Sequence, residues 1–270
     1  MCSKTIIHKS TKTIIKQNIK NYLQIFTIMK KLILTLTIIS VFSLSSFAQE
    51  EEKAHGFSLS MNTDAFFGLY NFAAGYVSLS DKLDFTYYGI MWSDIPNGTA
   101  GAFGAWTEFG AGINLNVADG ILGINPQIGL LSGTLLSGSE DAIFGEGIVP
   151  NLTVNLGTDL IEGQAYFGYY LPLFASNGLP EDTDANSFIH YWIYAGANIG
   201  FVTVGLQFEQ LSQPTGGGDE TLTNYSYIGP YINFGLWNGG GLRFTAGPEL
   251  SDDSTADFDS FYKLTFAHSF

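Results

Sequence analysis

The sequence predicts an all-β chain that closes into an antiparallel, up-and-down transmembrane barrel of about 12 strands. Segments of about 9 to 14 residues alternate apolar and polar side chains and end at Gly, Asn, Asp or Pro, as strands joined by turns do. Every second connection between these segments is a tight turn, and the connections that alternate with these turns are longer and polar. After residue 48, no uncharged apolar run reaches the roughly 20 residues of a membrane-spanning helix. Such a chain can span a membrane only as a closed barrel, because its strands must satisfy one another's backbone polar groups.

The expected strands follow one another along the whole chain after the N-terminal segment. They are 57–67, 71–79, 83–93, 103–117, 121–131, 146–156, 160–172, 187–199, 201–211, 225–237, 240–250 and 261–270. Ten strands remain an alternative if 71–79 or 146–156 is not one of them.

Loop length alternates with the parity of the connection. Tight turns are expected at 80–82, 118–120, 157–159, 200 and 238–239, and longer polar loops at 94–102, 132–145, 173–186, 212–224 and 251–260. Only the first hairpin, turning near Gly68, lacks a long loop. This alternation is typical of a membrane barrel and not of a soluble sandwich.

The two faces of the strands differ in chemistry, because successive side chains point to opposite sides. The apolar face, expected to lie outward in lipid, carries Leu83, Phe85, Tyr87, Met91, Phe109, Ile113, Leu115, Leu122, Ile124, Ile128, Leu130, Val202, Val204, Leu206 and Phe208. The polar face, expected to lie inward, carries Asp64, Asp84, Trp92, Glu108, Asn114, Asn116, Asn125, Gln127, Asn151, Asn155, Glu162, Gln164, Tyr166, Gln207, Glu209, Asn233, Arg243, Glu249 and Lys263.

The N-terminus has the pattern of a secretion signal. Met29-Lys30-Lys31 precedes an uncharged apolar run, 32–44, and small residues stand at Ser46 and Ala48, so we expect a signal peptide at 29–48 that is cleaved after Ala48. Residues 1–28 are interpreted as a mis-annotated extension, 49–56 as a short N-terminal tail and 57–270 as the barrel.

Charge and cysteine content exclude several classes of protein. After residue 48 the chain has four Lys and Arg against all 25 Asp and Glu, a formal charge of −21, which repels nucleic acid. The single cysteine, Cys2, precedes the expected cleavage point, so the mature chain has neither a disulfide nor a thiol nucleophile.

The last strand carries a further signal. In Tyr262-Lys263-Leu264-Thr265-Phe266-Ala267-His268-Ser269-Phe270, apolar side chains alternate with small or polar ones up to a terminal phenylalanine. This segment resembles the terminal strand of Gram-negative outer-membrane β-barrels, and the resemblance covers about 56–270. It implies an outer-membrane location, contact with lipid, periplasmic chaperones and the barrel-assembly machinery. It also implies that Tyr262, Leu264, Phe266 and Phe270 form the assembly signal and that the tight turns are periplasmic.

The charged residues of the polar face are candidates to line a pore: Asp64, Asp84, Glu108, Glu162, Glu209, Arg243, Glu249 and Lys263. Among them, Asp64, Glu249 and Lys263 are expected to meet in a salt bridge near the outer rim, because they lie on neighbouring strands. The inward Glu108, Glu162 and Glu209 predict a negative lumen that favours cations.

Motifs for catalysis and cofactors are weak. His190 is the one inward histidine near the outer rim, but no G-x-S-x-G frame surrounds a serine, so an enzyme, for example one that acts on lipid, is disfavoured. No Cys/His metal spacing or other cofactor motif is present. The acidic loops 181–184 and 252–259 offer oxygen ligands for Ca²⁺, although solvated loop charge explains them as well.

Two functions remain. The first is a passive pore or channel for small cationic or neutral solutes. The alternative is a non-conducting barrel whose acidic outer loops bind an extracellular ligand or partner. Side chains that block the lumen would favour the alternative, and a continuous water path would favour the channel.

Overall fold

The computed structural model describes residues 54–92, 106–139, 141–180, 183–215, 221–236, 239–251, 254 and 259–270. They belong to one compact unit, Lys53–Phe270. Twelve strands account for most of them: β1 His55–Asp64, β2 Gly68–Ser80, β3 Leu83–Trp92, β4 Trp106–Val117, β5 Leu122–Gly133, β6 Ile143–Gly157, β7 Ile161–Pro172, β8 Ser187–Ile199, β9 Val202–Thr215, β10 Leu222–Gly235, β11 Gly240–Pro248 and β12 Ser260–Ser269. No helix among the described residues has the length and apolar character needed to cross a membrane.

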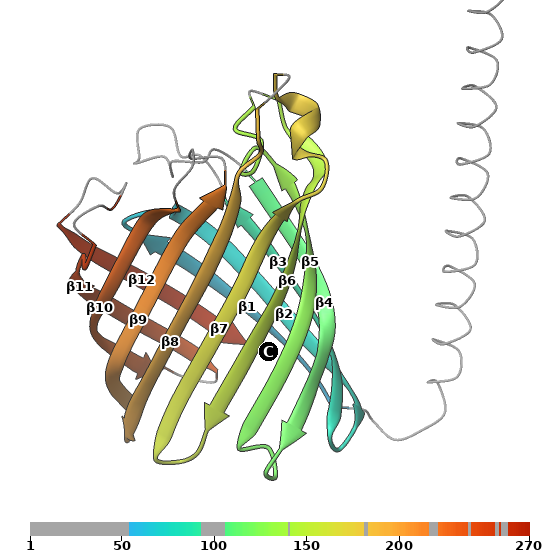
Figure 1. Cartoon of the computed structure of the whole chain (residues 1–270). Helices are drawn as coiled ribbons and strands as arrows, with labels where there is room; N and C mark the ends of the chain where they lie inside the picture. Colours follow the sequence, from blue (N-terminus) through green and yellow to red (C-terminus); the bar gives the residue numbers. More distant parts are fainter. Residues whose placement is uncertain are drawn as a thin grey trace, which may run out of the picture. The chain divides into compact units, whose positions relative to one another are not determined.

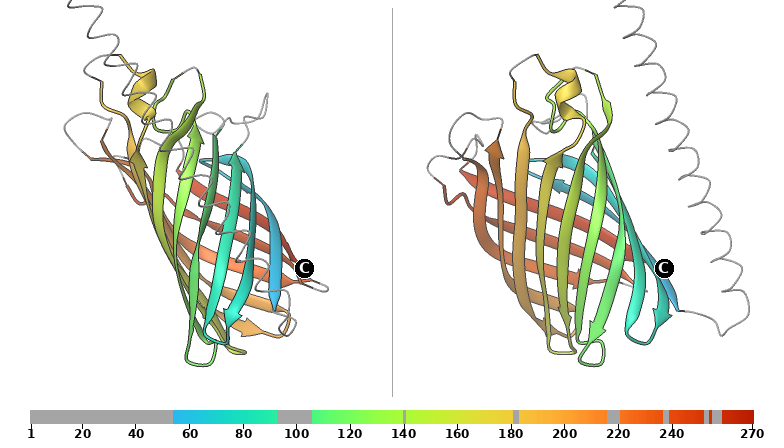
Figure 2. Two further views of the ribbon diagram at one scale, coloured as in Figure 1. Left: turned by 90° about the vertical axis from the view of Figure 1, so that its right-hand side faces the viewer. Right: turned by 45° about the vertical axis from the view of Figure 1, so that its right-hand side comes forward.

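The strands close into one antiparallel barrel, in which each strand pairs with its neighbours in sequence and β1 pairs with β12 (Figures 1 and 2). The β1–β12 seam runs from Ser58 opposite Ser269 to Asp64 opposite Lys263. The predicted fold class and the count of 12 strands are confirmed.

Connection length alternates between the two ends of the barrel, as the sequence predicts. We call the end with tight turns the turn end and the opposite end the loop end. At the turn end, Ala118, Asp119 and Gly120 adopt positive φ in the tight turn between β4 and β5, a backbone that glycine adopts without steric cost. At the loop end, the β7–β8 connection contains the single-turn helix η1, Ala175–Gly178, at the top of Figure 1.

The first strand differs from its predicted range, 57–67, at both ends. β1 starts at His55, inside the expected tail 49–56, because His55 and Gly56 pair with Val77 and Tyr76 of β2. It stops at Asp64 and not at residue 67, because the Asp64 carboxylate accepts the N–H groups of Phe66 and Phe67 and so takes them out of the ladder.

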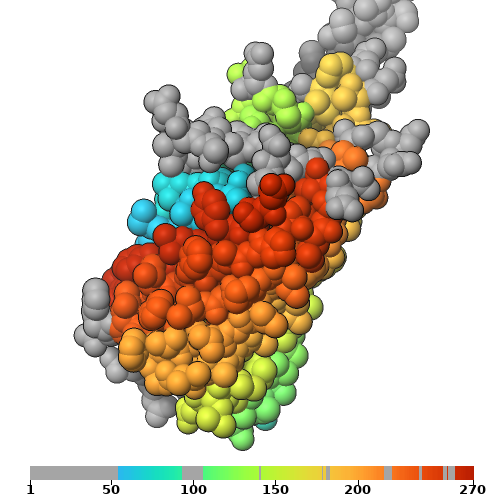
Figure 3. Space-filling view, turned by 90° about the vertical axis from the view of Figure 1, so that its left-hand side faces the viewer, coloured from blue at the N-terminus to red at the C-terminus, as the bar shows by residue number. Residues whose placement is uncertain are grey.

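The predicted alternation of faces is confirmed. Outward side chains such as Phe109, Ile128 and Leu206 are 56–60% exposed, whereas the inward Asp64, Glu108 and Glu209 are at most 1% exposed. Figure 3 views the outer surface over the later strands, which cross it obliquely from orange to red. A surface this apolar is suited to lipid.

Buried apolar side chains gather inside the barrel at its loop end. They come from the wall strands, from the first hairpin and from the β5–β6 and β7–β8 loops, and we call them the loop-end cluster: Phe66, Phe67, Trp92, Trp106, Leu131, Leu135, Leu136, Val149, Tyr170, Ala175, Ala185, Phe188, Leu211, Tyr225, Tyr227 and Phe261.

Candidate functional site

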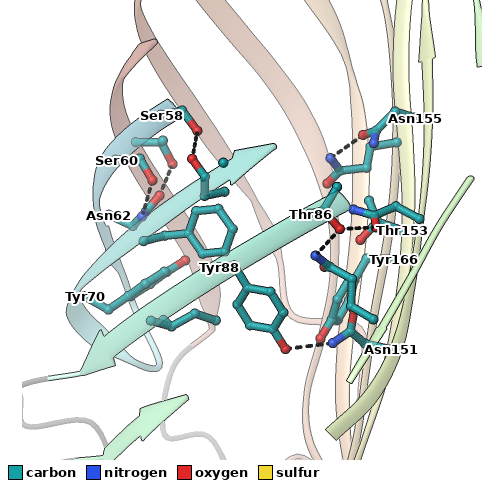
Figure 4. A pocket seen from close by; sticks show the side chains of 18 of the residues that line it. Ser58, Ser60, Asn62, Tyr70, Thr86, Tyr88, Asn151, Thr153, Asn155 and Tyr166 are labelled. Carbon is teal, nitrogen blue, oxygen red and sulfur yellow. Dashed lines mark hydrogen bonds between the residues drawn. The ribbon is translucent and has the colours of Figure 1, made fainter. Parts of the chain in front are cut away.

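The lumen contains a chamber of about 690 Å³. It reaches from Phe57 and Phe270 at the turn end to Phe67, Tyr70 and Trp92 at the loop end. Its walls combine amide and hydroxyl side chains with aromatic rings, several of which Figure 4 draws. A volume of this size falls within the range of roughly 300–1,000 Å³ that small-molecule sites have.

The chamber remains open between the turn end and the loop-end cluster because inward rings such as Tyr88 and Tyr166 lie along the wall. The Tyr88 ring lies over Gly110 of β4 and Gly129 of β5, and a Cβ at Gly110 would stand 2.2 Å from Tyr88 Cε1. The Tyr166 ring likewise lies against Gly168, where a Cβ would stand 2.3 Å from the tyrosine hydroxyl. Glycine in the strand thus permits a close approach of the ring.

The tip of the first hairpin closes the loop end of the chamber. Phe67 makes ring contacts with Trp92 of β3 (5.9 Å), His190 of β8 (5.8 Å) and Tyr225 of β10 (6.2 Å), so its side chain crosses the lumen. Phe66 packs on Tyr225 at 4.7 Å. We refer to Phe66 and Phe67 as the plug.

Asp64 holds the plug in place. Its Oδ1 accepts the N–H of Phe66 at 3.0 Å and that of Phe67 at 2.6 Å, so both backbone donors of the plug have an acceptor inside the barrel. Its Oδ2 is buried and has no hydrogen-bond partner among the described residues.

Beneath the plug, Glu209 of β9 is bound by donors from three other strands, β8, β10 and β12. Lys263 Nζ lies 3.1 Å from Glu209 Oε2 and His190 Nε2 lies 3.0 Å from Oε1. The hydroxyls of Tyr225 (2.8 Å) and Tyr227 (3.0 Å) also donate to this carboxylate. A carboxylate with no exposed surface needs such partners, because burial removes its hydration.

A second ion pair spans the lumen closer to the turn end. Arg243 of β11 donates to Glu162 of β7 at 2.5 Å, and the Tyr231 hydroxyl donates to the same carboxylate oxygen at 3.0 Å. The Arg243 guanidinium lies 4.2 Å from the Tyr194 ring centroid, a cation–π distance.

The other inward carboxylates also have partners. Glu108 accepts the Tyr88 hydroxyl, which in turn accepts Asn151 Nδ2 at 2.8 Å. Asp84 accepts the Ser78 hydroxyl at 2.7 Å and the Asn116 amide at 2.9 Å.

The expected salt bridge of Asp64, Glu249 and Lys263 is not formed among the described residues. Lys263 binds Glu209, and Asp64 binds the plug backbone. Glu249 accepts the backbone N–H of Ser226 (2.8 Å) and of Ser251 (3.2 Å) just after β11 ends. The prediction considered only neighbouring strands, whereas the actual partner of Lys263 lies across the curved wall.

The charge facing the chamber differs from the expected negative lumen. Of the eight predicted pore-lining residues, only Lys263 and Arg243 line the chamber, and Asp84 and Glu162 line a cavity of about 620 Å³ at the turn end. Glu108 and Glu209 lie behind the donors that bind them.

Sequence reasoning missed the plug and the two tyrosines that bind Glu209. The predicted strand 57–67 ends with Phe66 and Phe67, whereas β1 ends at Asp64. The available signal was Asp64, which precedes Phe66 by two residues and Phe67 by three, in the one predicted hairpin without a long loop. Asp side chains commonly accept the N–H groups of a following turn.

The acidic loops lie partly outside the described residues, which leave out 181–182, 252–253 and 255–258. Within the described part of the chain, no group of three or more His, Asp or Glu side chains is arranged to hold a metal ion.

The barrel resembles solved structures of outer-membrane channels. The COG4313 outer membrane channel from Pseudomonas putida F1 matches with a TM-score of 0.53 at 9% identity, over 82% of this chain and 97% of that one. The NanC porin matches with a TM-score of 0.48 at 7% identity, over 78% and 98%. These similarities concern the fold. Comparison with curated protein sequences gives no match. A family model does match residues 29–270, and the chain belongs to that family, which is described as "Family of unknown function (DUF6733)".

Proposed function

We propose that this protein is an integral outer-membrane channel for small neutral polar solutes and that its described conformation is closed at the loop end. The chamber carries the proposal, because a lumen whose lining includes many amide and hydroxyl side chains offers a path for polar molecules. The apolar outer face and the aromatic terminal strand support an outer-membrane location.

Neutral solutes are preferred over cations in this proposal. Lys263 and Arg243 face the chamber, each compensated by a carboxylate, and neither Asp nor Glu is among the described residues that line it. A cation entering the chamber therefore meets like charge and no free carboxylate.

The loop-end cluster favours a second candidate, a barrel that never conducts and whose outer loops bind a ligand or partner. A catalytic function is not proposed, because His190 Nε2 is already shared by Glu209 and Tyr225.

Planar-bilayer recording distinguishes the two candidates. The wild type is compared with Phe66→Ala/Phe67→Ala and with a control that loses two lipid-facing rings, Phe85→Ala/Phe109→Ala. The channel proposal expects rare, small conductance steps for wild type and control, and frequent, larger steps for the plug variant. Absence of conductance in a plug variant that is folded, as judged by heat-modifiable migration in gels, would overturn it and favour the closed barrel.

A further inference from the structure

The inner face of β5 to β8 carries a regular array of amides and rings. Strand pairing places Asn125, Thr153, Tyr166 and Trp192 in one row across four strands. The next row towards the turn end contains Asn155, Gln164 and Tyr194, and the next towards the loop end contains Gln127 and Asn151. All nine side chains line the chamber.

The two rings of the middle row stack face to face, and we call this stacked pair the platform. Tyr166 and Trp192 stack with centroids 3.9 Å apart and an angle of 14° between the rings. Trp192 Nε1 donates to Gln164 Oε1 at 2.7 Å, which fixes the indole, and Gln164 Nε2 donates to Asn155 Oδ1 at 2.8 Å. The platform is therefore held rigidly before any ligand arrives, which reduces the entropy lost on binding.

Amide groups with unused hydrogen-bonding capacity flank the platform. Gln127 Nε2 donates to the Thr86 hydroxyl, and this hydroxyl donates to Asn125 Oδ1. Figure 4 marks hydrogen bonds at Thr86 with dashed lines. Within the described residues, this leaves Gln127 Oε1 without a donor and the Nδ2 groups of Asn125 and Asn155 without an acceptor. The chamber thus offers free donors and a free acceptor beside an aromatic surface.

We infer that the β5–β8 wall is a binding site for a neutral saccharide. A pyranose ring has an apolar C–H face that packs on an aromatic platform, and its hydroxyls both donate and accept hydrogen bonds. The charges at the two ends of the chamber are already compensated by Glu209 and Glu162, so the site provides no net charge for an ionic ligand. This inference rests on the proposed channel function, since it names the solute class of the same lumen.

The test uses three sugars that share one ring and differ in charge: glucose, glucuronic acid and glucosamine. Binding to the purified full barrel in detergent is measured by calorimetric titration at neutral pH, and needs no conduction. We expect glucose to bind more tightly than both charged analogues. Tighter binding of glucuronic acid or glucosamine, or no binding of any of the three, would overturn the inference even if the plug variant conducts.

Variants locate the site on the wall. Tyr166→Ala is expected to weaken glucose binding by about fivefold to tenfold, as loss of an aromatic contact does. Tyr166→Phe keeps the ring and should bind as the wild type does, and so should Phe167→Ala, which removes the adjacent lipid-facing ring. Unchanged glucose affinity in Tyr166→Ala contradicts the assignment. If that variant does not fold, the ranking of the three sugars on the wild type still decides the ligand class. If glucose binds but the plug variant does not conduct, the channel proposal is refuted and the saccharide site is not.

Discussion

Lys263 and Glu209 form an ion pair across the curved interior of the barrel, with Nζ 3.1 Å from Oε2, although their strands, β12 and β9, are not neighbours. Glu209 has no exposed surface, and the side chain of Lys263 is 16% exposed. The pair therefore connects two separate parts of the wall in a place where water contributes little.

Lys263→Met should destabilise the barrel strongly. It leaves a buried carboxylate without its lysine, a loss that typically costs about 3–5 kcal/mol. Urea unfolding followed by tryptophan fluorescence in detergent measures the change. Adding Glu209→Gln removes the uncompensated charge and should restore part of the stability. If Lys263→Met alone is as stable as the wild type, Lys263 does not stabilise the buried Glu209 carboxylate.

Gly110→Ala should displace the Tyr88 ring. The new methyl group would overlap the ring, and rotation of the ring would break its hydrogen bond to Glu108, leaving a buried acceptor unsatisfied at a cost of about 1–3 kcal/mol. Gly157→Ala is the control, because nothing lies within 4 Å of a Cβ there. Equal unfolding midpoints for the two variants would refute the argument.

Asp64→Ala should release the plug. Without the carboxylate, the N–H groups of Phe66 and Phe67 lose their acceptor, so the hairpin tip is held by ring contacts and by the hydrogen bond from Ala65 N–H to Tyr262 O. We expect more frequent conducting events in planar bilayers than with the wild type. Asp84→Ala removes another buried carboxylate, but near the turn end, and should leave event frequency unchanged. An equal increase in both would indicate general loosening of the barrel.

Arg243→Ala should shift selectivity towards cations. It leaves Glu162 uncompensated beside Asp84 in the turn-end cavity, and negative charge in a pore favours cations. The reversal potential under a salt gradient measures the shift, in the background of Phe66→Ala/Phe67→Ala. Glu162→Gln added to Arg243→Ala should reverse it, and an unchanged reversal potential in Arg243→Ala would exclude this role.

Phe270→Ala should impair assembly in cells more than folding in vitro. Phe270 is 76% exposed and its ring contacts His268 at 4.6 Å, while its backbone N–H donates to Phe57 O, a bond that alanine retains. The yield of folded barrel in the outer membrane is compared with refolding in detergent, with Phe167→Ala as control. Equal loss in both assays would argue against a recognition role.

The sequence was sufficient to predict the barrel because its evidence is local. Alternation of apolar and polar residues placed Glu108, Glu209 and Lys263 inward, and the alternating segments bounded by turn residues predicted twelve strands, with ten as the alternative. The partners of those residues could not be predicted, because contacts across the lumen depend on the curvature of the closed wall. The plug was missed because two phenylalanines extend an apolar pattern whether they lie in a strand or turn inward.

The seam between β1 and β12 has a consequence for biogenesis. β1 leads directly into the plug and β12 carries Lys263, and their pairing ends with Asp64 opposite Lys263. The ladder that closes the cylinder thus also brings the hairpin tip over the chamber and the lysine to its buried carboxylate. Closure of the cylinder and closure of its loop end therefore depend on the same pair of strands, and a barrel with an open seam would lack both.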